Sequence, residues 1–129
     1  MSATETVRAY YAALRGGEPL PPFFAERDDL VKVGITERLR GHGAVAAGLR
    51  EQSRETSDWT VESRDLRVAE REATAWFSDA VALAWTGPDG RHEHDSRWSG
   101  TLARAGGSDG SGTDDGEWRF VGMHVSAPH

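Results

Sequence analysis

Apolar residues near the start of the chain recur at the spacing of one helix face. Val7 begins a series at i, i+3, i+4 and i+7 that includes the paired tyrosines Tyr10 and Tyr11, and this is the period of an amphipathic helix. A serine and a glutamate three residues apart, at 2–5, have the spacing of a capping box. Two consecutive glycines end the pattern. The sequence therefore predicts a first helix over residues 4–14.

The middle of the chain changes from a helical period to a period of two. A proline-rich stretch indicates a turn or the start of a short helix, and a brief strand is predicted over residues 30–35. Residues 44–55 carry no proline and place Val45, Leu49 and Gln52 on one face, which predicts a further helix. Apolar and polar residues then alternate, so we predict a continuous strand over residues 58–68.

The second half of the chain has the pattern of an antiparallel meander. Residues 75–86 are the most apolar segment, which indicates a central strand covered on both faces. The sequence GPDG at 87–90 predicts a turn, followed by a hairpin partner over 91–105. A segment of Gly, Ser and Asp at 106–116 predicts a mobile loop, and the last strand is predicted over 117–126. Helices followed by such a meander predict an α+β fold with a curved antiparallel sheet.

Length and composition narrow the class of protein. The chain has 129 residues, which we interpret as one domain over 1–129. It contains no cysteine, so disulfides and thiolate chemistry are excluded. The net charge of −6 with scattered acidic residues argues against nucleic acid. No apolar run approaches the roughly 20 residues that cross a bilayer, so we predict no membrane partner and a cytoplasmic location. Among 15 basic residues the only lysine is Lys32.

Three side chains are candidates for acid-base chemistry. His124 follows aromatic residues in the last strand, and an imidazole can serve as general acid or base; the alternative is a hydrogen-bonded structural histidine. Asp79 interrupts the most apolar strand, where an ionised carboxylate is costly unless paired; the alternative is an edge or bulge position facing water. Arg97 could hold a carboxylate or enolate; the alternative is an ion pair with Asp79 or Asp95, or a solvated edge.

A second set of residues consists of candidates for a ligand pocket. Aromatic side chains close a core or line a cavity, and their positions alone do not separate the two roles. Ser126 shares the face of His124 if the final strand is unbroken. His92 and His94 occupy alternate positions, so they could share a strand face and bind a divalent metal. No third ligand accompanies those histidines, so we predict no metal. The pocket candidates are Tyr10, Tyr11, Trp76, Trp85, Trp98, Trp118 and Ser126.

Several short motifs resemble one known family. They are RWSGTL at 97–102, DGEWRF at 115–120, MHVS at 123–126 and VGITERLRG at 33–41. Together with the opening helix and its paired tyrosines, they resemble the SnoaL-like group of the nuclear transport factor two-like superfamily. The resemblance implies a cone-shaped fold, in which a long curved sheet wraps around a helix, with a pocket at the open end and frequent homodimers.

The resemblance leaves two classes of function open. Relatives include polyketide cyclases, ketosteroid isomerase, scytalone dehydratase and limonene epoxide hydrolase, and also the non-enzymatic association domain of calcium/calmodulin-dependent protein kinase two. One hypothesis is a non-catalytic domain that binds a small molecule or dimerises. The alternative is a cofactor-free isomerase, dehydratase or cyclase in which Asp79 or His124 moves a proton and Arg97 polarises a small apolar substrate. The chain has no dinucleotide fingerprint or phosphate-binding loop, so we predict no cofactor.

Overall fold

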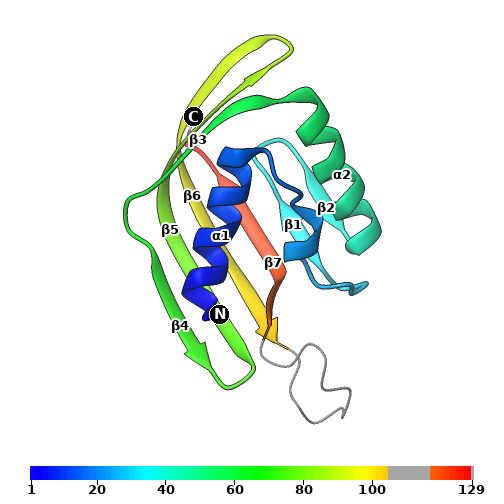
Figure 1. Cartoon of the computed structure of the whole chain (residues 1–129), viewed down its shortest axis with the longest axis vertical. Helices are drawn as coiled ribbons and strands as arrows, with labels where there is room; N and C mark the ends of the chain where they lie inside the picture. The colour runs from blue at the N-terminus through cyan, green and yellow to red at the C-terminus, as the bar shows by residue number, and fades with distance from the viewer. Residues whose placement is uncertain (105–116, 129) are drawn as a thin grey trace.

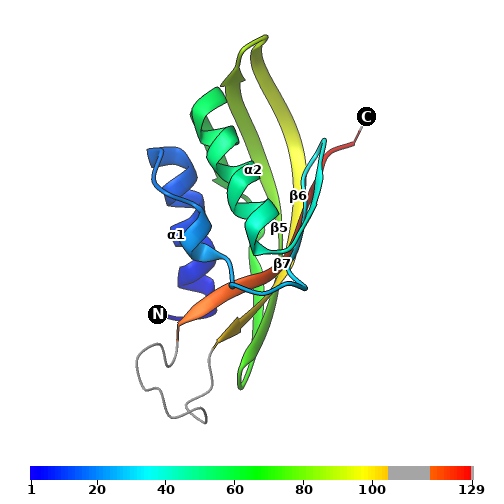
Figure 2. The ribbon, with the colours of Figure 1, turned by 90° about the vertical axis from the view of Figure 1, so that its right-hand side faces the viewer.

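Two α-helices and a single-turn 3-10 helix cover one face of a curved, unclosed sheet of seven strands in the part of the chain that the computed structural model describes, residues 1–104 and 117–128. Figure 1 shows α1 and α2 in front of the strands, and Figure 2 shows both on the same side of the sheet. The loop predicted at 106–116 lies outside the described residues. The elements are α1 (Ala3–Gly16), η1 (Pro21–Phe23), β1 (Val31–Val33), β2 (Arg38–Arg40), α2 (His42–Glu55), β3 (Ser57–Ser63), β4 (Arg67–Arg71), β5 (Thr74–Gly87), β6 (Gly90–Arg104) and β7 (Trp118–Ser126).

The ends of α1 follow the predicted signals. The Ser2 hydroxyl accepts from the Glu5 backbone N–H at 3.1 Å, and the Ser2 backbone N–H donates to the Glu5 carboxylate at 2.8 Å. This capping box satisfies two donors that a helix start leaves unpaired. At the other end Gly17 adopts φ 69°, the left-handed conformation that closes a helix. The first helix is therefore confirmed, with both ends set by local sequence.

Helix α2 lies close to the edge strand β2 because a glycine faces it. A Cβ at Gly48 would stand 2.6 Å from a methyl carbon of Leu39, which is closer than such atoms approach. The predicted helix is confirmed and begins two residues earlier, at His42, after Gly41 with φ 86°. The close approach places one side of α2 opposite the inner face of the sheet.

The sheet is mixed rather than purely antiparallel. Its strand order is β2-β1-β7-β6-β5-β3, and β4 also pairs with β5. Strand β1 runs parallel to β7, with Lys32 opposite Met123, so the prediction of an antiparallel sheet is wrong at this one pairing. Local alternation indicates a strand but not the direction of a neighbour that is distant in the sequence. The sequence pattern did not predict the short strand β2.

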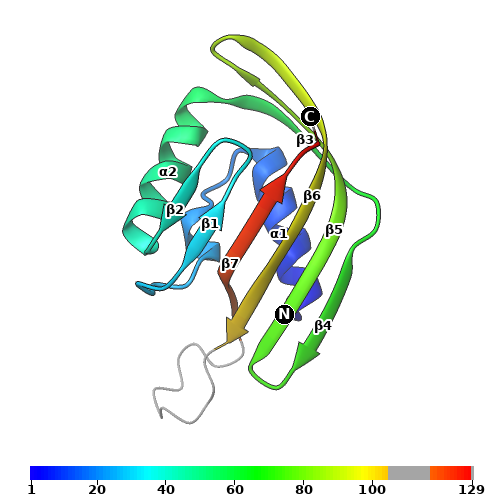
Figure 3. The ribbon, with the colours of Figure 1, turned by 180° about the vertical axis from the view of Figure 1, so that it is seen from behind.

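The first half of strand β5 is covered on one face only. Its residues alternate between buried and exposed from Thr74 to Val81, so the prediction of cover on both faces is wrong. Helices lie against the inner face, whereas Figure 3 shows the strands in front of the helices when the molecule is seen from behind. Trp76, Ala80 and Ala82 on the outer face are apolar, which made the segment look uniformly apolar. The predicted turn at 87–90 is confirmed, because β5 and β6 pair from Gly87 and Gly90.

Aromatic rings pack α1 against η1 and the start of β7. The Tyr10 ring packs edge-on against Phe23, Phe24 and Phe120, with centroid distances of 5.4, 5.7 and 5.3 Å. Edge-to-face pairs at this spacing add stability beyond the burial of their surface. The core is therefore dense around the Tyr10 ring, and a cavity remains beside Tyr10 and Leu14 of α1.

Candidate functional site

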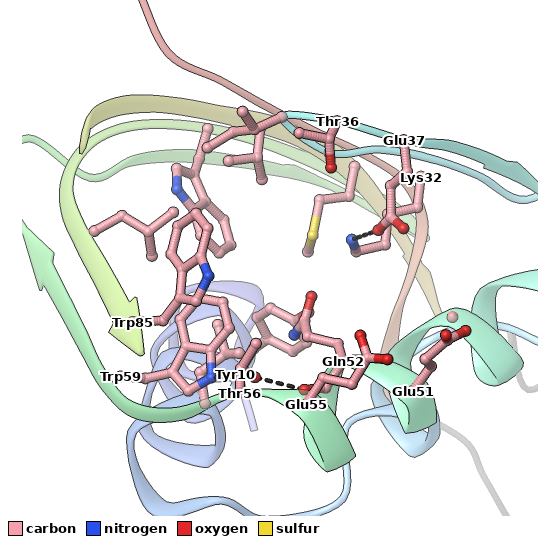
Figure 4. A pocket seen from close by; sticks show the side chains of 18 residues that line it. Tyr10, Lys32, Thr36, Glu37, Glu51, Gln52, Glu55, Thr56, Trp59 and Trp85 are labelled. Carbon is pink, nitrogen blue, oxygen red and sulfur yellow. Dashed lines mark hydrogen bonds and ion pairs between the residues drawn. The ribbon is translucent and has the colours of Figure 1, made fainter. Parts of the chain in front are cut away.

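A cavity of about 400 Å³ lies between α2, the turn joining β1 to β2, and the inner face of β5, β6 and β7. This volume is within the range of small-molecule sites. Figure 4 shows side chains converging on it from these elements. The residues that line it are Tyr10, Leu14, Lys32, Gly34, Ile35, Thr36, Glu37, Gly48, Glu51, Gln52, Glu55, Thr56, Trp59, Leu83, Trp85, Trp98, Met123 and Val125.

Stacked tryptophans form one wall of the cavity. The rings of Trp59 and Trp85 stack with centroids 5.1 Å apart, and the Trp59 indole N–H donates to the Thr56 hydroxyl at 3.0 Å. Trp98 is held deeper, since its indole N–H donates to the Ser96 hydroxyl at 3.0 Å. The polar edges of Trp59 and Trp98 are thus already bonded within the protein. The wall that these tryptophans present to the cavity is therefore largely apolar.

The opposite end of the cavity is polar. The Lys32 ammonium donates to the Glu37 carboxylate at 3.2 Å, and the turn between them closes through a Gly34 N–H to Glu37 carbonyl bond of 2.9 Å. Burial raises the pKa of the Tyr10 hydroxyl well above its usual value, and the Glu37 carboxylate adds to this shift. Tyr10 is therefore neutral at physiological pH, whereas the ion pair supplies the charges at this end.

Helix α2 supplies the remaining polar groups. Figure 4 shows Gln52 reaching into the cavity from the wall opposite Lys32, with Glu51 and Glu55 nearer the rim. Both glutamates are exposed, whereas Gln52 is half-buried. The cavity therefore has aromatic walls, one buried ammonium and an acidic rim.

The carboxylate of Asp79 is bound within the core rather than in the cavity. It accepts from the Tyr11 hydroxyl at 3.0 Å, the Ser63 hydroxyl at 2.6 Å and the Asp65 backbone N–H at 2.9 Å. The residue is 6% exposed and pairs in register with Trp98 across β5 and β6, so the alternative of an edge or bulge position facing water is wrong. Desolvation raises the pKa of Tyr11, and the Asp79 charge adds to it. Asp79 binds α1 to the sheet.

This carboxylate also explains why the strand predicted over 58–68 is two strands. β3 pairs with β5 up to Ser63 opposite Val81, and β4 resumes with Arg67 opposite Ser78. Asp79 stands between these two pairings and accepts hydrogen bonds from the intervening chain. At the break one backbone hydrogen bond remains, from the Arg64 N–H to the Ala80 carbonyl at 2.8 Å, and the Asp79 side chain accepts the bonds beside it. Period-two alternation cannot reveal such a break.

His124, Arg97 and Ser126 lie on the outer face of the sheet, away from the cavity. Leu102 pairs with Phe120 and Thr101 with Gly122, so β7 carries one extra residue between them. The bulge changes the phase of the strand, and His124 is exposed on the opposite face from Phe120. The expectation that His124 lies beside those aromatic residues is therefore wrong. Asp79, Arg97 and His124 do not converge on one cavity.

The predicted aromatic residues separate into three groups. Tyr10, Trp85 and Trp98 line the cavity. Tyr11 is buried against Trp98 with centroids 5.2 Å apart, but it is not among the lining residues. The remaining two tryptophans lie elsewhere: Trp76 is 48% exposed on the outer face, and Trp118 is buried with the Arg104 guanidinium 4.9 Å from its ring.

Sequence reasoning missed the polar end of the cavity. Lys32 is the chain's only lysine, and strand alternation places it on the same face as Leu30, which is fully buried. A lysine in phase with a core leucine is the signal that could have found it. Gln52 had a comparable signal, because it shares the helix face of Val45 and Leu49, which are buried. Glu37 had none, because its orientation depends on a turn.

The two histidines considered as metal ligands lie against Trp85 instead. The centroids of His92 and His94 lie 5.1 and 5.4 Å from that ring, and the His92 Nε2 is 2.8 Å from the Asp89 carboxylate. Within residues 1–104 and 117–128, no three His, Cys, Asp or Glu side chains are grouped to hold a metal ion. In the same ranges no helix is long and apolar enough to span a bilayer.

Comparison with known proteins agrees with the observed fold. The family model described as a SnoaL-like domain matches residues 4–129. No curated protein matches the chain significantly. Among solved structures, a nuclear transport factor two-like protein of unknown function in nutrient uptake from Rhodospirillum rubrum has a TM-score of 0.78 at 17% identity and covers 100% of both chains.

Two further solved structures show the same likeness. A provisionally named dehydratase from Streptomyces avermitilis has a TM-score of 0.78 at 15% identity, covering 97% of this chain and 93% of its own. A nuclear transport factor two-like superfamily protein from Salmonella enterica has a TM-score of 0.78 at 17% identity, covering 98% and 88%. At such identities the likeness shows a common fold.

Proposed function

The chain belongs to the SnoaL-like domain family, and from this premise we propose that it binds a small aromatic molecule in the cavity beside α2 without transforming it. The observation that supports the proposal is the cavity of about 400 Å³, with stacked tryptophans on one wall and the Lys32–Glu37 pair at the other end. Apolar walls with a few convergent polar groups are typical of ligand sites.

The alternative of proton-transfer catalysis has less support. A general acid or base must come within hydrogen-bond reach of the substrate, but Asp79 is bonded within the core and His124 lies on the outer face. Arg97 is also on the outer face. The groups that the sequence suggested for catalysis therefore have no common substrate position, which favours binding over an isomerase, dehydratase or cyclase.

Ligand binding can be tested with two tryptophans on the same strand. Trp85 lines the cavity and Trp76 stands on the opposite face of β5. We expect 2-acetylnaphthalene to bind saturably in isothermal titration calorimetry. Trp85→Ala should weaken binding by about tenfold through lost ring contact, and Trp76→Ala should leave it unchanged. Absence of saturable binding, or equal losses in both variants, would contradict the proposal.

We also propose that the protein forms a homodimer through the outer face of the sheet and acts in the cytoplasm. Trp76 is a large apolar side chain that is 48% exposed there, and its β5 neighbours Ser78 and Ala80 are small. An exposed tryptophan above small residues suits close packing of a second copy.

If the dimer forms through this face, a charged side chain at position 76 should dissociate it. Trp76→Glu should shift the protein from dimer to monomer in sedimentation velocity, because two carboxylates would be buried together. The exposed Thr74→Glu, on the same face of β5 but at its end, should remain dimeric. A wild-type protein that sediments as a monomer at micromolar concentration would exclude this part of the proposal.

A further inference from the structure

The Lys32 ammonium is the least satisfied buried charge beside the cavity. Its side chain is 7% exposed, and it makes one hydrogen bond, to Glu37, within the part of the chain that the structure describes. A lysine ammonium has three N–H donors, and leaving buried donors unmet is costly. Asp79, the other deeply buried charge, accepts three hydrogen bonds instead. The remaining donors of Lys32 are therefore available to an acceptor in the cavity.

The surroundings of Lys32 indicate the shape of that acceptor. Met123 pairs with Lys32 across β1 and β7, and Ile35 also lines this end. Beyond them the wall is formed by the tryptophans Trp59, Trp85 and Trp98. Figure 4 shows Gln52 as the polar group that reaches in from the far wall. A flat aromatic body with a single oxygen at one end fits this distribution of polar and apolar groups.

The charge of the cavity decides what kind of oxygen it accepts. Glu37 already neutralises Lys32, and Glu51 and Glu55 add two carboxylates at the rim. A ligand carboxylate would enter a cavity whose lining holds one ammonium and three carboxylates, so like charges would repel it. A neutral carbonyl oxygen can accept from Lys32 without that repulsion.

We propose that Lys32 recognises a neutral aromatic carbonyl compound, and that Glu37 makes the cavity select it over the corresponding carboxylate. This inference rests on the proposed function and specifies its ligand class. Lys32 donates to the carbonyl oxygen, the aromatic body lies along the Trp59, Trp85 and Trp98 wall, and Glu37 supplies the counter-charge.

Three probes of nearly equal shape test the selection on the full chain. They are 2-acetylnaphthalene, 2-ethylnaphthalene and 2-naphthoate, measured by isothermal titration calorimetry at neutral pH. The ketone should bind about tenfold tighter than the hydrocarbon, because it gains a hydrogen bond from a charged donor. It should also bind at least about tenfold tighter than the carboxylate, which the acidic cavity repels.

Two variants test whether Lys32 and Glu37 cause the preference for the ketone. Lys32→Met keeps a long apolar side chain, so it should still bind 2-ethylnaphthalene but lose the tenfold preference for the ketone. Glu37→Gln leaves the ammonium without its counter-charge, and it should bind 2-naphthoate at least about tenfold tighter than wild type does. The second variant removes a partly exposed carboxylate, so it provides a test even where Lys32→Met fails to fold.

The outcomes separate this inference from the proposed function. If all three probes bind wild type equally, or if Glu37→Gln leaves the affinity for 2-naphthoate unchanged, the inference is overturned while ligand binding stands. If no probe binds and Trp85→Ala changes nothing, the proposed function fails and the inference fails with it.

Discussion

Replacing Gly100 with alanine is expected to lower the free energy of unfolding by about 3 kcal/mol, the upper end of overpacking effects. Gly100 lies in β6 opposite Phe77, facing the core. An added Cβ would collide with the Gly122 carbonyl oxygen and stand 2.8 Å from the Phe77 ring. Neither the backbone of the bulged strand nor a ring that packs 5.8 Å from Phe120 can move away easily. Urea denaturation followed by circular dichroism measures the change.

Gly43→Ala is the matched control. A Cβ at Gly43 meets nothing within 4 Å, and the residue lies in the first turn of α2. Alanine favours helix over glycine, so this variant should be as stable as wild type or slightly more stable. Equal urea midpoints for Gly100→Ala and wild type would show that β6 and β7 do not approach as closely as the structure places them.

Asp79→Ala is expected to lower the free energy of unfolding by about 3 kcal/mol, because it leaves buried hydroxyl and N–H donors without an acceptor. The carboxylate accepts from Tyr11 in α1, from Ser63 at the end of β3, and from Asp65 between β3 and β4. One side chain therefore stabilises two features: the contact of α1 with the sheet, and the conformation of the chain between β3 and β4. The urea midpoint and hydrogen exchange at residues 63–65 should both report the loss.

Asp95→Ala serves as the control for charge. Asp95 pairs with Arg64 at 3.2 Å, but its side chain is 82% exposed, and exposed pairs contribute little. Its removal should leave the urea midpoint nearly unchanged. The isosteric Asp79→Asn, where folded, should bind 2-acetylnaphthalene as wild type does, because the carboxylate does not line the cavity. A large loss of affinity with unchanged stability would instead place Asp79 in the ligand site.

Local sequence was sufficient wherever short-range hydrogen bonds decide the structure. The Ser2–Glu5 capping box and Gly17 determine α1, and Gly90 with φ 120° closes the hairpin after the Pro88–Asp89 turn. These features involve residues within a few positions of one another. The α+β class followed from the same kind of evidence, since helical and strand periods are properties of single segments.

The candidate site was predicted only in part, because its residues come from segments far apart in the chain. Tyr10, Trp85 and Trp98 were recognised as large aromatic residues and do line the cavity. Glu37 and Gln52 were not recognised, and His124 was assigned to the wrong face because one extra residue in β7 reverses every side chain after it. A bulge depends on the partner strand, so the sequence of β7 alone does not show it.

The sequence by itself determined the helices, most of the strands and the hairpin, because periodicity, capping and turn chemistry act within each segment. Only the tertiary structure decided that β1 joins β7 in parallel, that Asp79 is satisfied by Tyr11 across 68 residues, and that Lys32 faces a cavity. Burial and pairing depend on which distant segments exclude water together. The same lysine would be an ordinary surface residue on the other face of β1.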